Sequence, residues 1–246
     1  MGNLLKGKVV LVTGAGSGVG QAVAVAYAAN GATVIASDIN LSNTISRLKS
    51  KKSVYFIETD VTNLRDCSRL INKIIEKYGR LNIAFNSGGL LGEVTLPDDM
   101  NAANFNHVIL TNLTSIYYCM KYEIQTMLDN GGGIIINSPT VLDFEEVDSF
   151  IGYVAAKHGI IGLTQNAALK YAKKNISIHC VAPDFVHAPL LETIDIKSKT
   201  ASSFQQVSGQ RSKAEGIAAM ALCLSSCEGS SATSSYHPGE GYSSSN

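Results

Sequence analysis

The chain has 246 residues, of which 45% are hydrophobic and 16% are charged, and this length is sufficient for one large α/β domain with a single core. Twenty Lys and Arg residues balance twenty Asp and Glu residues, so the formal net charge is zero. This balance argues against nucleic acid or an anionic membrane as the main partner, and it favours a small ligand.

The first predicted element is a short apolar strand over residues 8–12, which leads into a glycine-rich loop. The residues before this strand are too few for a signal peptide or a membrane span, so no membrane association is expected. A helix is predicted over residues 21–30, ending at Gly31. Glycines at positions 14, 18 and 20 let the backbone turn tightly and approach a pyrophosphate at the start of this helix.

The second predicted strand covers residues 33–37 and is followed by Asp38. A carboxylate at this position can accept hydrogen bonds from both hydroxyls of an adenosine ribose. Ile39 comes next and no arginine is near, so a 2′-phosphate would meet only negative charge, and NAD(H) is favoured over NADP(H). A glycine pattern alone would also fit a plain tight turn. Strand, glycines, helix, strand and acid in this order make the plain turn the weaker interpretation.

Four further strands alternate with helices along the rest of the chain. Apolar runs predict strands over residues 54–59, 81–85, 134–137 and 176–181. Helices are predicted over residues 104–127 and 152–171, and another begins after Thr62 as its N-cap. The alternation implies one parallel sheet with helices on both faces, in a single domain over residues 1–229. The serine-rich segment 230–246 reads as a flexible tail, and whether it holds a seventh strand stays open.

Polar residues occur where two of these strands end. Asp60 and Val61 close the third strand, and Asn86 with the Ser-Gly-Gly after it follows the fourth. Doubly wound sheets bind ligands at the carboxyl ends of their strands, so the backbone after Asn86 can approach a nucleotide closely. Asn112 lies among apolar residues of the predicted helix over 104–127, where a polar side chain needs a partner unless it is at the surface.

Tyr153 and Lys157 are four residues apart on the predicted helix over 152–171 and therefore share one face. A free tyrosine titrates near pKa ~10, so acid/base work near neutrality needs a shift of about 3 units, or ~4 kcal/mol. One ammonium at ~4 Å and an effective dielectric of ~20 favours the phenolate by roughly 4 kcal/mol. The pair therefore predicts an acid/base device, although the same spacing also occurs simply as a core edge and a solvated tip.

Together these residues resemble the short-chain dehydrogenase/reductase family in its single-domain form. The resemblance covers residues 7 to about 228. Its motifs are Thr13 to Gly20 for TGxxxGxG, Asp60-Val61, Asn86, Asn112 and Tyr153-x-x-x-Lys157. It implies a Rossmann-like doubly wound sheet with strand order 3-2-1-4-5-6-7. It also implies NAD(P)(H)-dependent interconversion of secondary alcohols and ketones, and homodimers or homotetramers built through the helices of Asn112 and Tyr153.

The resemblance also implies a role for each matching residue. Tyr153 would give or take the hydroxyl proton, Lys157 would lower its pKa and bind the nicotinamide ribose, and Asn112 would hold a water. The family usually has a serine thirteen residues before the tyrosine, where this chain has Thr140. Thr140 is favoured because its hydroxyl can make the same hydrogen bonds, and Ser138 is the alternative. The residues expected to hold the nucleotide are Gly14, Gly16, Ser17, Gly18, Val19, Gly20, Asp38, Asp60, Val61, Asn86, Gly88, Tyr153, Lys157, Pro183 and Val186.

The sequence departs from the family pattern on the nicotinamide side. The usual Pro-Gly after the sixth strand is Pro183-Asp184, and Ala188 stands where the family has a threonine. Residues 189–207 are expected to form a lid whose apolar side chains exclude water from a ligand. Acidic residues between Thr140 and Tyr153 disfavour an anionic substrate, so a small neutral alcohol or ketone is expected.

An NAD(H)-dependent oxidoreductase acting on secondary alcohols and ketones is the leading functional hypothesis. The departures leave two alternatives open: a dinucleotide-binding sensor or partner subunit, and a redox-neutral isomerase or lyase on the same fold. Five cysteines are an odd number without metal-ligand spacing. Reduced thiols, no metal site and a cytoplasmic location are therefore expected.

Overall fold

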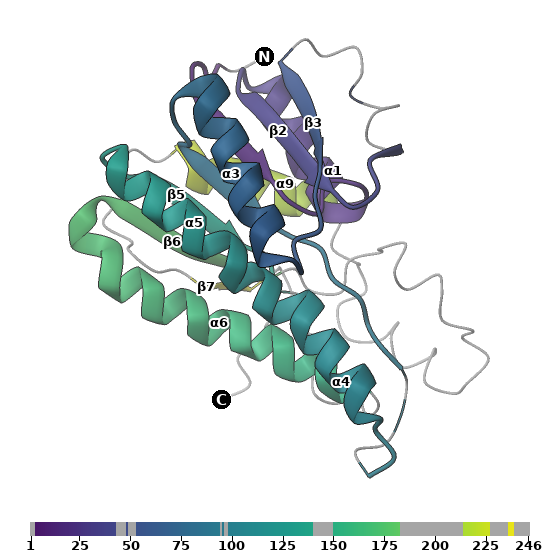
Figure 1. Ribbon diagram of the computed structural model, residues 1–246. Helices are drawn as coiled ribbons and strands as arrows, with labels where there is room; N and C mark the ends of the chain where they lie inside the picture. Colours follow the sequence, from purple (N-terminus) through teal and green to yellow (C-terminus); the bar gives the residue numbers. More distant parts are fainter. Residues whose placement is uncertain are drawn as a thin grey trace.

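The computed structural model describes residues 3–42, 48, 53–93, 95, 98–139, 150–182, 214–226 and 236–238. These residues form a parallel sheet between two layers of helices (Figure 1). The strand order is β3-β2-β1-β4-β5-β6-β7, which confirms the predicted doubly wound topology. The strands are β1 Val9–Val12, β2 Thr33–Asp38, β3 Val54–Glu58, β4 Ile83–Asn86, β5 Gly133–Asn137, β6 Ile176–Ala182 and β7 Tyr236–Pro238.

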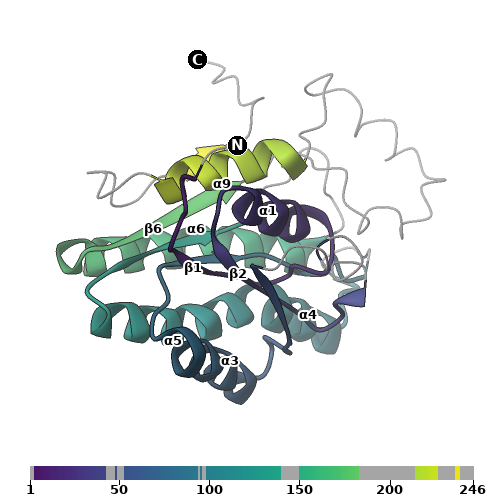
Figure 2. The ribbon, with the colours of Figure 1, turned by 90° about the horizontal axis from the view of Figure 1, so that it is seen from above.

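Helices cover both faces of the sheet. One face carries α1 and α9, and the other carries α3, α5 and α6 (Figure 2). Alternate residues of β1 serve the two faces: Val10 and Val12 pack in the core on the α1 side, whereas Leu11 packs in the core on the α3 side. The helices are α1 Gly18–Ala29, α3 Leu64–Tyr78, α4 Ala102–Ile109, α5 Ser115–Asp129, α6 Ile151–Tyr171, a 3₁₀ turn at Ala172–Lys174, and α9 Ala214–Ser226.

Two elements near the C-terminus complete the domain. α9, which is absent from the elements predicted above, packs on α1, where the Tyr27 hydroxyl shares a 2.7 Å hydrogen bond with Ser225 Oγ. β7 pairs in parallel with β6, with Cys180 opposite Tyr236. The seventh strand thus exists within the segment 230–246, as the family order implies.

The start of α3 differs from the prediction in its capping residue. Asn63 is the N-cap, and its side chain accepts a hydrogen bond from Arg65 N at 2.9 Å. The Thr62 hydroxyl instead donates to Asp60 Oδ1 at 2.6 Å. The prediction of Thr62 as the cap is therefore wrong, because the preceding aspartate already engages its hydroxyl.

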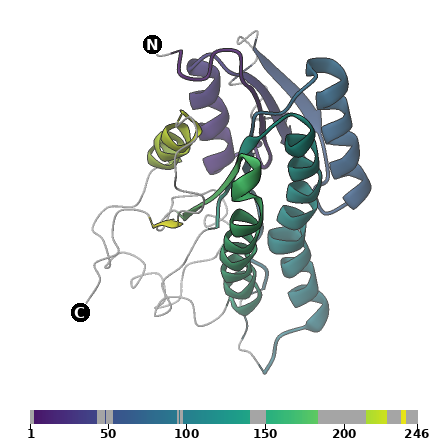
Figure 3. The same cartoon turned by 90° about the vertical axis from the view of Figure 1, so that its left-hand side faces the viewer.

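The long helix predicted over residues 104–127 is interrupted at its centre. α4 ends at Ile109, residues Leu110–Thr114 form a π-helical turn, and α5 begins at Ser115. Figure 3 shows this run in teal beside α6 in green, and α4 contacts α6. A π turn holds one residue more than a regular turn and frequently occurs at functional sites. Asn112 lies in this turn and is fully buried.

The position of β1 determines where a ligand can bind. β1 lies between β2 and β4, so the order of the strands reverses at this point. In open α/β sheets such a switch point leaves a crevice outside the carboxyl ends of the strands. The residues that follow β1, β2 and β4 are therefore brought together at one edge of the sheet.

Candidate active site

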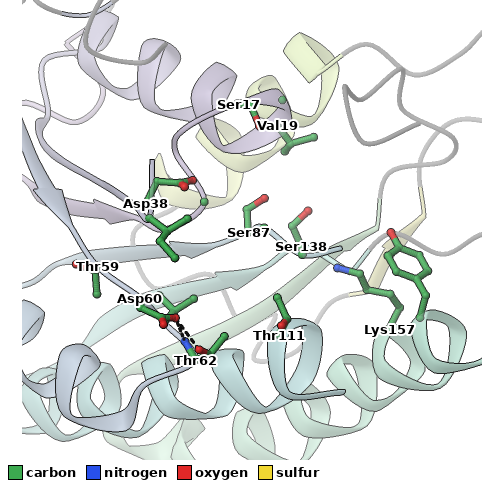
Figure 4. Close-up of a pocket in the computed structure, with 17 residues that line it drawn as sticks. Ser17, Val19, Asp38, Thr59, Asp60, Thr62, Ser87, Thr111, Ser138 and Lys157 are labelled. Carbon is green, nitrogen blue, oxygen red and sulfur yellow. Dashed lines mark hydrogen bonds between the residues drawn. The ribbon is translucent and has the colours of Figure 1, made fainter. Parts of the chain in front are cut away.

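A cleft lies at the carboxyl ends of β1 to β5 (Figure 4). It brings together the glycine loop, the end of β2, the segment after β3, the segment after β4, and side chains from the π turn, β5 and α6. The predicted site residues that line it are Gly14, Ser17, Gly18, Val19, Asp38, Asp60, Val61, Gly88, Ser138, Tyr153 and Lys157. The segment after Asn86, which was predicted to approach a nucleotide, also lines it through Ser87 and Gly89. The residues that line it without having been predicted are Ile39, Thr59, Thr62 and Thr111.

The glycine loop packs closely against other main-chain segments, which leaves no space for side chains at two of its positions. Gly14 has φ +63°, and a Cβ there would lie 2.6 Å from the carbonyl carbon of Ser87 at the end of β4, so no other residue fits without a shift. A Cβ on Gly20 would collide with the carbonyl oxygen of Gly14. Gly16 and Gly20 are not among the residues that line the cleft. In this structure they shape the loop, and their direct contact with a nucleotide stays a prediction.

Asp38 is held at the end of β2 by main-chain donors. Its Oδ2 accepts a hydrogen bond from Gly16 N at 2.8 Å, and its Oδ1 accepts one from Asn40 N at 3.0 Å. These bonds fix the carboxylate beside the glycine loop while the residue lines the cleft. Among the described lining residues Lys157 is the single cation, and it belongs to a different part of the cleft from Asp38 (Figure 4). Among the residues that the structure describes, the Asp38 end of the cleft therefore carries negative charge only.

Asp60 forms a compact turn on the neighbouring wall. Its Oδ1 accepts hydrogen bonds from the Thr62 main-chain N at 2.9 Å and from the Thr62 hydroxyl at 2.6 Å, as the dashed lines in Figure 4 show. This arrangement turns the chain after β3 so that Val61 also lines the cleft. The predicted pair after the third strand is thus located at the same edge as Asp38.

Asn86 does not line the cleft. Its side chain is fully buried and bonds to three other buried residues. The Thr13 hydroxyl donates to its Oδ1 at 3.4 Å, and its Nδ2 donates to Glu123 Oε2 at 2.9 Å and to Asn137 Oδ1 at 3.1 Å. The cleft is instead lined by the three residues that follow it, Ser87–Gly89. A direct contact between Asn86 and a nucleotide therefore stays a prediction, whereas its location at the strand end is clear.

Tyr153 and Lys157 lie side by side on the first turns of α6. Both line the cleft, and each side chain is only 4% exposed. Lys157 Nζ lies 5.2 Å from the centroid of the Tyr153 ring. Burial lowers the pKa of Lys157 from 10.5 to about 8, while the nearby Cys180 thiol acts in the opposite direction. The amine is thus buried against the phenol, rather than extending into solvent as an ordinary surface lysine does.

Asn112 presents an unpartnered oxygen next to Lys157. Its Nδ2 donates to the carbonyls of Leu90 at 2.8 Å and Val108 at 3.0 Å. Its Oδ1 is buried and has no hydrogen-bond partner among the described residues. A Cβ on Gly89 would collide with this oxygen and would lie 3.4 Å from Lys157 Nζ. The two polar atoms therefore border the same space, and a buried acceptor without a partner is a fitting position for a water.

A cluster of apolar side chains packs around Tyr153. Leu91, Val108 and Phe150 are buried and pack with Tyr153, and Leu90 and Val154 pack against them partly exposed. This apolar cluster comes from the segment after β4, from α4 and from the start of α6. It gives the phenol an environment with little access to water.

Several predicted positions lie outside the described residues. These are Thr140, Pro183 and Val186, the departures at Asp184 and Ala188, and the proposed lid over 189–207. Ser138, the alternative to Thr140, is described: it lines the cleft, is 5% exposed, and its main-chain N donates to Asn86 O at 2.9 Å.

The lining residues that sequence reasoning missed had unequal signals. Ile39 and Thr59 directly follow β2 and β3, so strand ends alone could have indicated them. Thr111 had no such signal, because its position depends on the π turn. Its Oγ1 is buried and, like Asn112 Oδ1, has no partner among the described residues. Thr111 lines the cleft, whereas Asn112 does not. An unpartnered buried hydroxyl in the cleft, together with a glycine loop that a Cβ would block, fits a polar nucleotide ligand.

No helix in the described parts of the chain is long and apolar enough to cross a membrane. No group of three or more His, Cys, Asp or Glu side chains within the same parts is arranged to hold a metal ion.

Comparisons with known proteins agree with the fold. The family model described as short chain dehydrogenase matches residues 8–199. Cyclohexanol dehydrogenase of Acinetobacter sp. (strain SE19) is 36% identical over 197 residues, covering 78% of each protein. The 3beta-hydroxysteroid dehydrogenase of Mediterraneibacter gnavus is 34% identical over 200 residues, covering 79% of this chain and 72% of that protein. The crystal structure of levodione reductase has a TM-score of 0.85 at 28% identity, covering 95% of this chain and 96% of that one.

These relatives are named as dehydrogenases and reductases, so the prediction of an oxidoreductase acting on CH–OH groups is confirmed. The matched residues include the glycine loop, Asp38, Asn112, Tyr153 and Lys157. The chain belongs to the short chain dehydrogenase family.

Proposed function

We propose that the protein is an NAD(H)-dependent oxidoreductase that interconverts a secondary alcohol and a ketone. The observation that carries this proposal is that Tyr153 and Lys157 are buried together in a cleft that also contains Asp38. An acid/base pair and an anionic nucleotide-binding residue in the same cleft are what hydride transfer with an alcohol requires.

Tyr153 acts as the general acid and base. In the oxidation direction its phenolate takes the hydroxyl proton of the alcohol, and in the reduction direction its phenol returns that proton to the ketone oxygen. Lys157 keeps an ammonium near the phenol, which favours the phenolate and brings its pKa toward neutrality. The low dielectric of the apolar cluster strengthens this effect.

Asn112 and a hydroxyl that follows β5 are the other two side chains proposed to take part in catalysis. Asn112 Oδ1 is free to accept a bond from a water, which would connect Lys157 with solvent and carry the proton away. The hydroxyl that binds the substrate oxygen is assigned to Thr140, with Ser138 as the alternative that lines the described cleft.

The cofactor is assigned as NAD(H), which supplies or accepts the hydride when bound. The Asp38 carboxylate is placed to accept bonds from ribose hydroxyls, and no cation near it among the described residues would receive a 2′-phosphate. Thr111 and the residues of the glycine loop would hold the rest of the nucleotide, together with Pro183 and Val186 on the nicotinamide side.

The substrate is proposed to be a neutral alcohol or ketone on an apolar ring. The apolar cluster of Leu91, Val108 and Phe150 beside Tyr153 supports this class, because it offers contact area but no charge. Relatives whose names specify cyclohexanol and a hydroxysteroid support the same class. We further propose a cytoplasmic homodimer or homotetramer that forms through α4, α5 and α6.

The test measures the change in NADH absorbance while the protein is incubated with cyclic and aliphatic alcohols and ketones. The wild-type chain is expected to turn over at least one cyclic substrate with NAD(H), and more efficiently than with NADP(H). Tyr153→Phe is expected to lower kcat by roughly 10²-fold or more. Tyr171→Phe, at the other end of α6, is the matched control and should retain the wild-type rate.

Two results would contradict the proposal. Full activity of Tyr153→Phe would exclude the tyrosine as the acid and base. Binding of NADH without turnover of any substrate in the panel would instead favour a nucleotide-binding sensor.

A further inference from the structure

A fully buried carboxyl group lies beneath the cleft and has no part in the proposed reaction. It belongs to Glu123 on α5, which is 0% exposed. Asn86 Nδ2 donates to its Oε2 at 2.9 Å, while Oε1 has no hydrogen-bond partner among the described residues. Burial raises the pKa of Glu123 to about 8, and the Asn86 bond acts in the opposite direction. Burial thus favours the neutral carboxylic acid over the carboxylate at neutral pH.

Glu123 ends a buried polar network that consists of Thr13, Asn86, Glu123, Asn137 and Thr164. The Thr13 hydroxyl donates to Asn86 Oδ1, and Asn86 Nδ2 donates to both Glu123 and Asn137. Asn137 Nδ2 donates to Thr164 Oγ1 at 2.9 Å, and the Thr164 hydroxyl donates to a carbonyl one turn earlier in α6 at 2.7 Å. Asn86 thus uses its oxygen and both of its N–H groups, so its amide has one orientation.

The network lies directly under two segments of the cleft. Ser87–Gly89 follow Asn86, and Ser138 follows Asn137. All four of these residues line the cleft. Thr164 lies two turns after Lys157 on α6. A change in the orientation of either amide would therefore move main-chain atoms that face a bound nucleotide.

The titratable groups around Glu123 come from several elements. Cys119, one turn earlier on α5, interacts with the carboxyl and faces Cys67 of α3, with the two Sγ atoms 4.0 Å apart. Lys157 and Cys180 lie at the far end of the network, beyond Thr164. Among the described residues, Asn86 Nδ2 is the single hydrogen-bond donor to the Glu123 carboxyl. A negative charge on Glu123 would therefore be stabilised by one amide hydrogen bond.

Burying a carboxyl group is less favourable than burying an apolar side chain of similar size. In this position, however, an apolar side chain would leave one N–H of Asn86 buried without an acceptor. The acid therefore supplies an acceptor that the rest of the network does not.

We propose that Glu123 is a positioning residue that works in its neutral form: it accepts a bond from Asn86 and, through Asn137, holds the strand-end segments that line the cleft. A carboxylate would accept the Asn86 bond more strongly, but an unpaired charge in this fully buried position should open the packing around Glu123 and so weaken nucleotide binding. This role of Glu123 rests on the proposed function in one respect: NADH is chosen as the ligand for the binding test.

Three variants distinguish the role of Glu123 as a hydrogen-bond acceptor for Asn86 from the effect of ionising its carboxyl group. Glu123→Gln keeps an acceptor for Asn86 and cannot ionise, whereas Glu123→Leu removes the acceptor. Ile124→Ala is the matched control, because it removes apolar atoms of the neighbouring buried residue on α5 and no hydrogen bond. Infrared difference spectra should show the carbonyl stretch of a protonated carboxylic acid in the wild-type protein at neutral pH, and this band should be missing from Glu123→Gln.

NADH affinity is then measured by calorimetry at about pH 7 and about pH 9, on either side of the Glu123 pKa of about 8. At about pH 7, Glu123→Gln should bind within about threefold of wild type, and Glu123→Leu about tenfold more weakly or worse. Between the two pH values the wild type should lose more affinity than Glu123→Gln. Lys157 titrates in both proteins, so its effect cancels in this comparison.

The proposal is overturned if Glu123→Leu binds NADH as tightly as the wild type does. It is also overturned if Glu123→Gln and Glu123→Leu lose NADH affinity equally, or if the wild type lacks the infrared band of a protonated carboxylic acid. If Glu123→Leu does not fold, the pH contrast between wild type and Glu123→Gln decides. If the wild type binds no NADH, the proposed function fails, and hydrogen exchange at Ser87–Gly89 becomes the readout. Exchange there should be faster in Glu123→Leu than in Ile124→Ala, and equal rates would overturn the positioning role.

Discussion

Replacing Lys157 by methionine is expected to stabilise the protein while it lowers kcat. Burial lowers the pKa of Lys157 from 10.5 to about 8, and a difference of this size corresponds to roughly 3 kcal/mol. The unfolded chain binds the proton more tightly, so the folded state is penalised fully below about pH 8, and the penalty declines as the pH rises toward 10.5. Lys157→Met should therefore raise the free energy of unfolding at neutral pH by up to roughly 3 kcal/mol.

The assay is urea denaturation followed by far-UV circular dichroism, because the chain has no tryptophan for fluorescence. Lys170→Met, at an exposed position of the same helix, is the control and should change stability by less than about 0.5 kcal/mol. The same Lys157→Met protein should lose about 10²-fold or more in kcat. The reasoning is refuted if Lys157→Met is no more stable than wild type at neutral pH. It is also refuted if the excess stability does not shrink between about pH 8 and pH 10.5.

Two further changes test the packing around the cleft and beneath α9. Gly89→Ala places a Cβ against Asn112 Oδ1 at φ +150°, so it should displace Asn112 and lower kcat about tenfold or more. Gly162→Ala, with nothing within 4 Å of its Cβ, should keep the wild-type rate and gain about 0.5–1 kcal/mol in stability. Equal rates for the two variants would count against a role for Asn112. Tyr27→Phe leaves Ser225 Oγ without its 2.7 Å partner and should cost about 1–3 kcal/mol in urea denaturation; a neutral result would mean that α9 does not depend on this bond.

The sheet and its order were predictable because strands buried on both faces need continuous apolar runs. Val9–Val12 is such a run, and Gly14 after it lies where the backbone approaches the end of another strand so closely that only glycine fits. Asp38 was predictable for the same reason, since it directly follows the second apolar run. The helical spacing of Tyr153 and Lys157 predicted that they share a face, and both are buried in the cleft.

Other features depend on packing that no local pattern records. Thr62 and Asn63 are both good caps, and the choice between them is made by the Asp60 carboxylate. α9 is rich in alanine and has little contrast between an apolar and a polar face, so periodicity did not indicate it. Glu123 occupies a fully buried position of α5, but an acid in a helix indicates a solvated face unless its buried partner, Asn86, is known.

The π turn at Leu110–Thr114 has a consequence for how this enzyme can diversify. One residue more in a turn rotates the side chains that follow by about 100° around the helix axis. Val108, before the turn, packs beside Tyr153, whereas Met120, after it, packs in the core beneath the sheet. The turn thus divides one continuous helix into a part that packs beside Tyr153 and a part that anchors the sheet. Substitutions in α4 can alter the first without disturbing the register of the second.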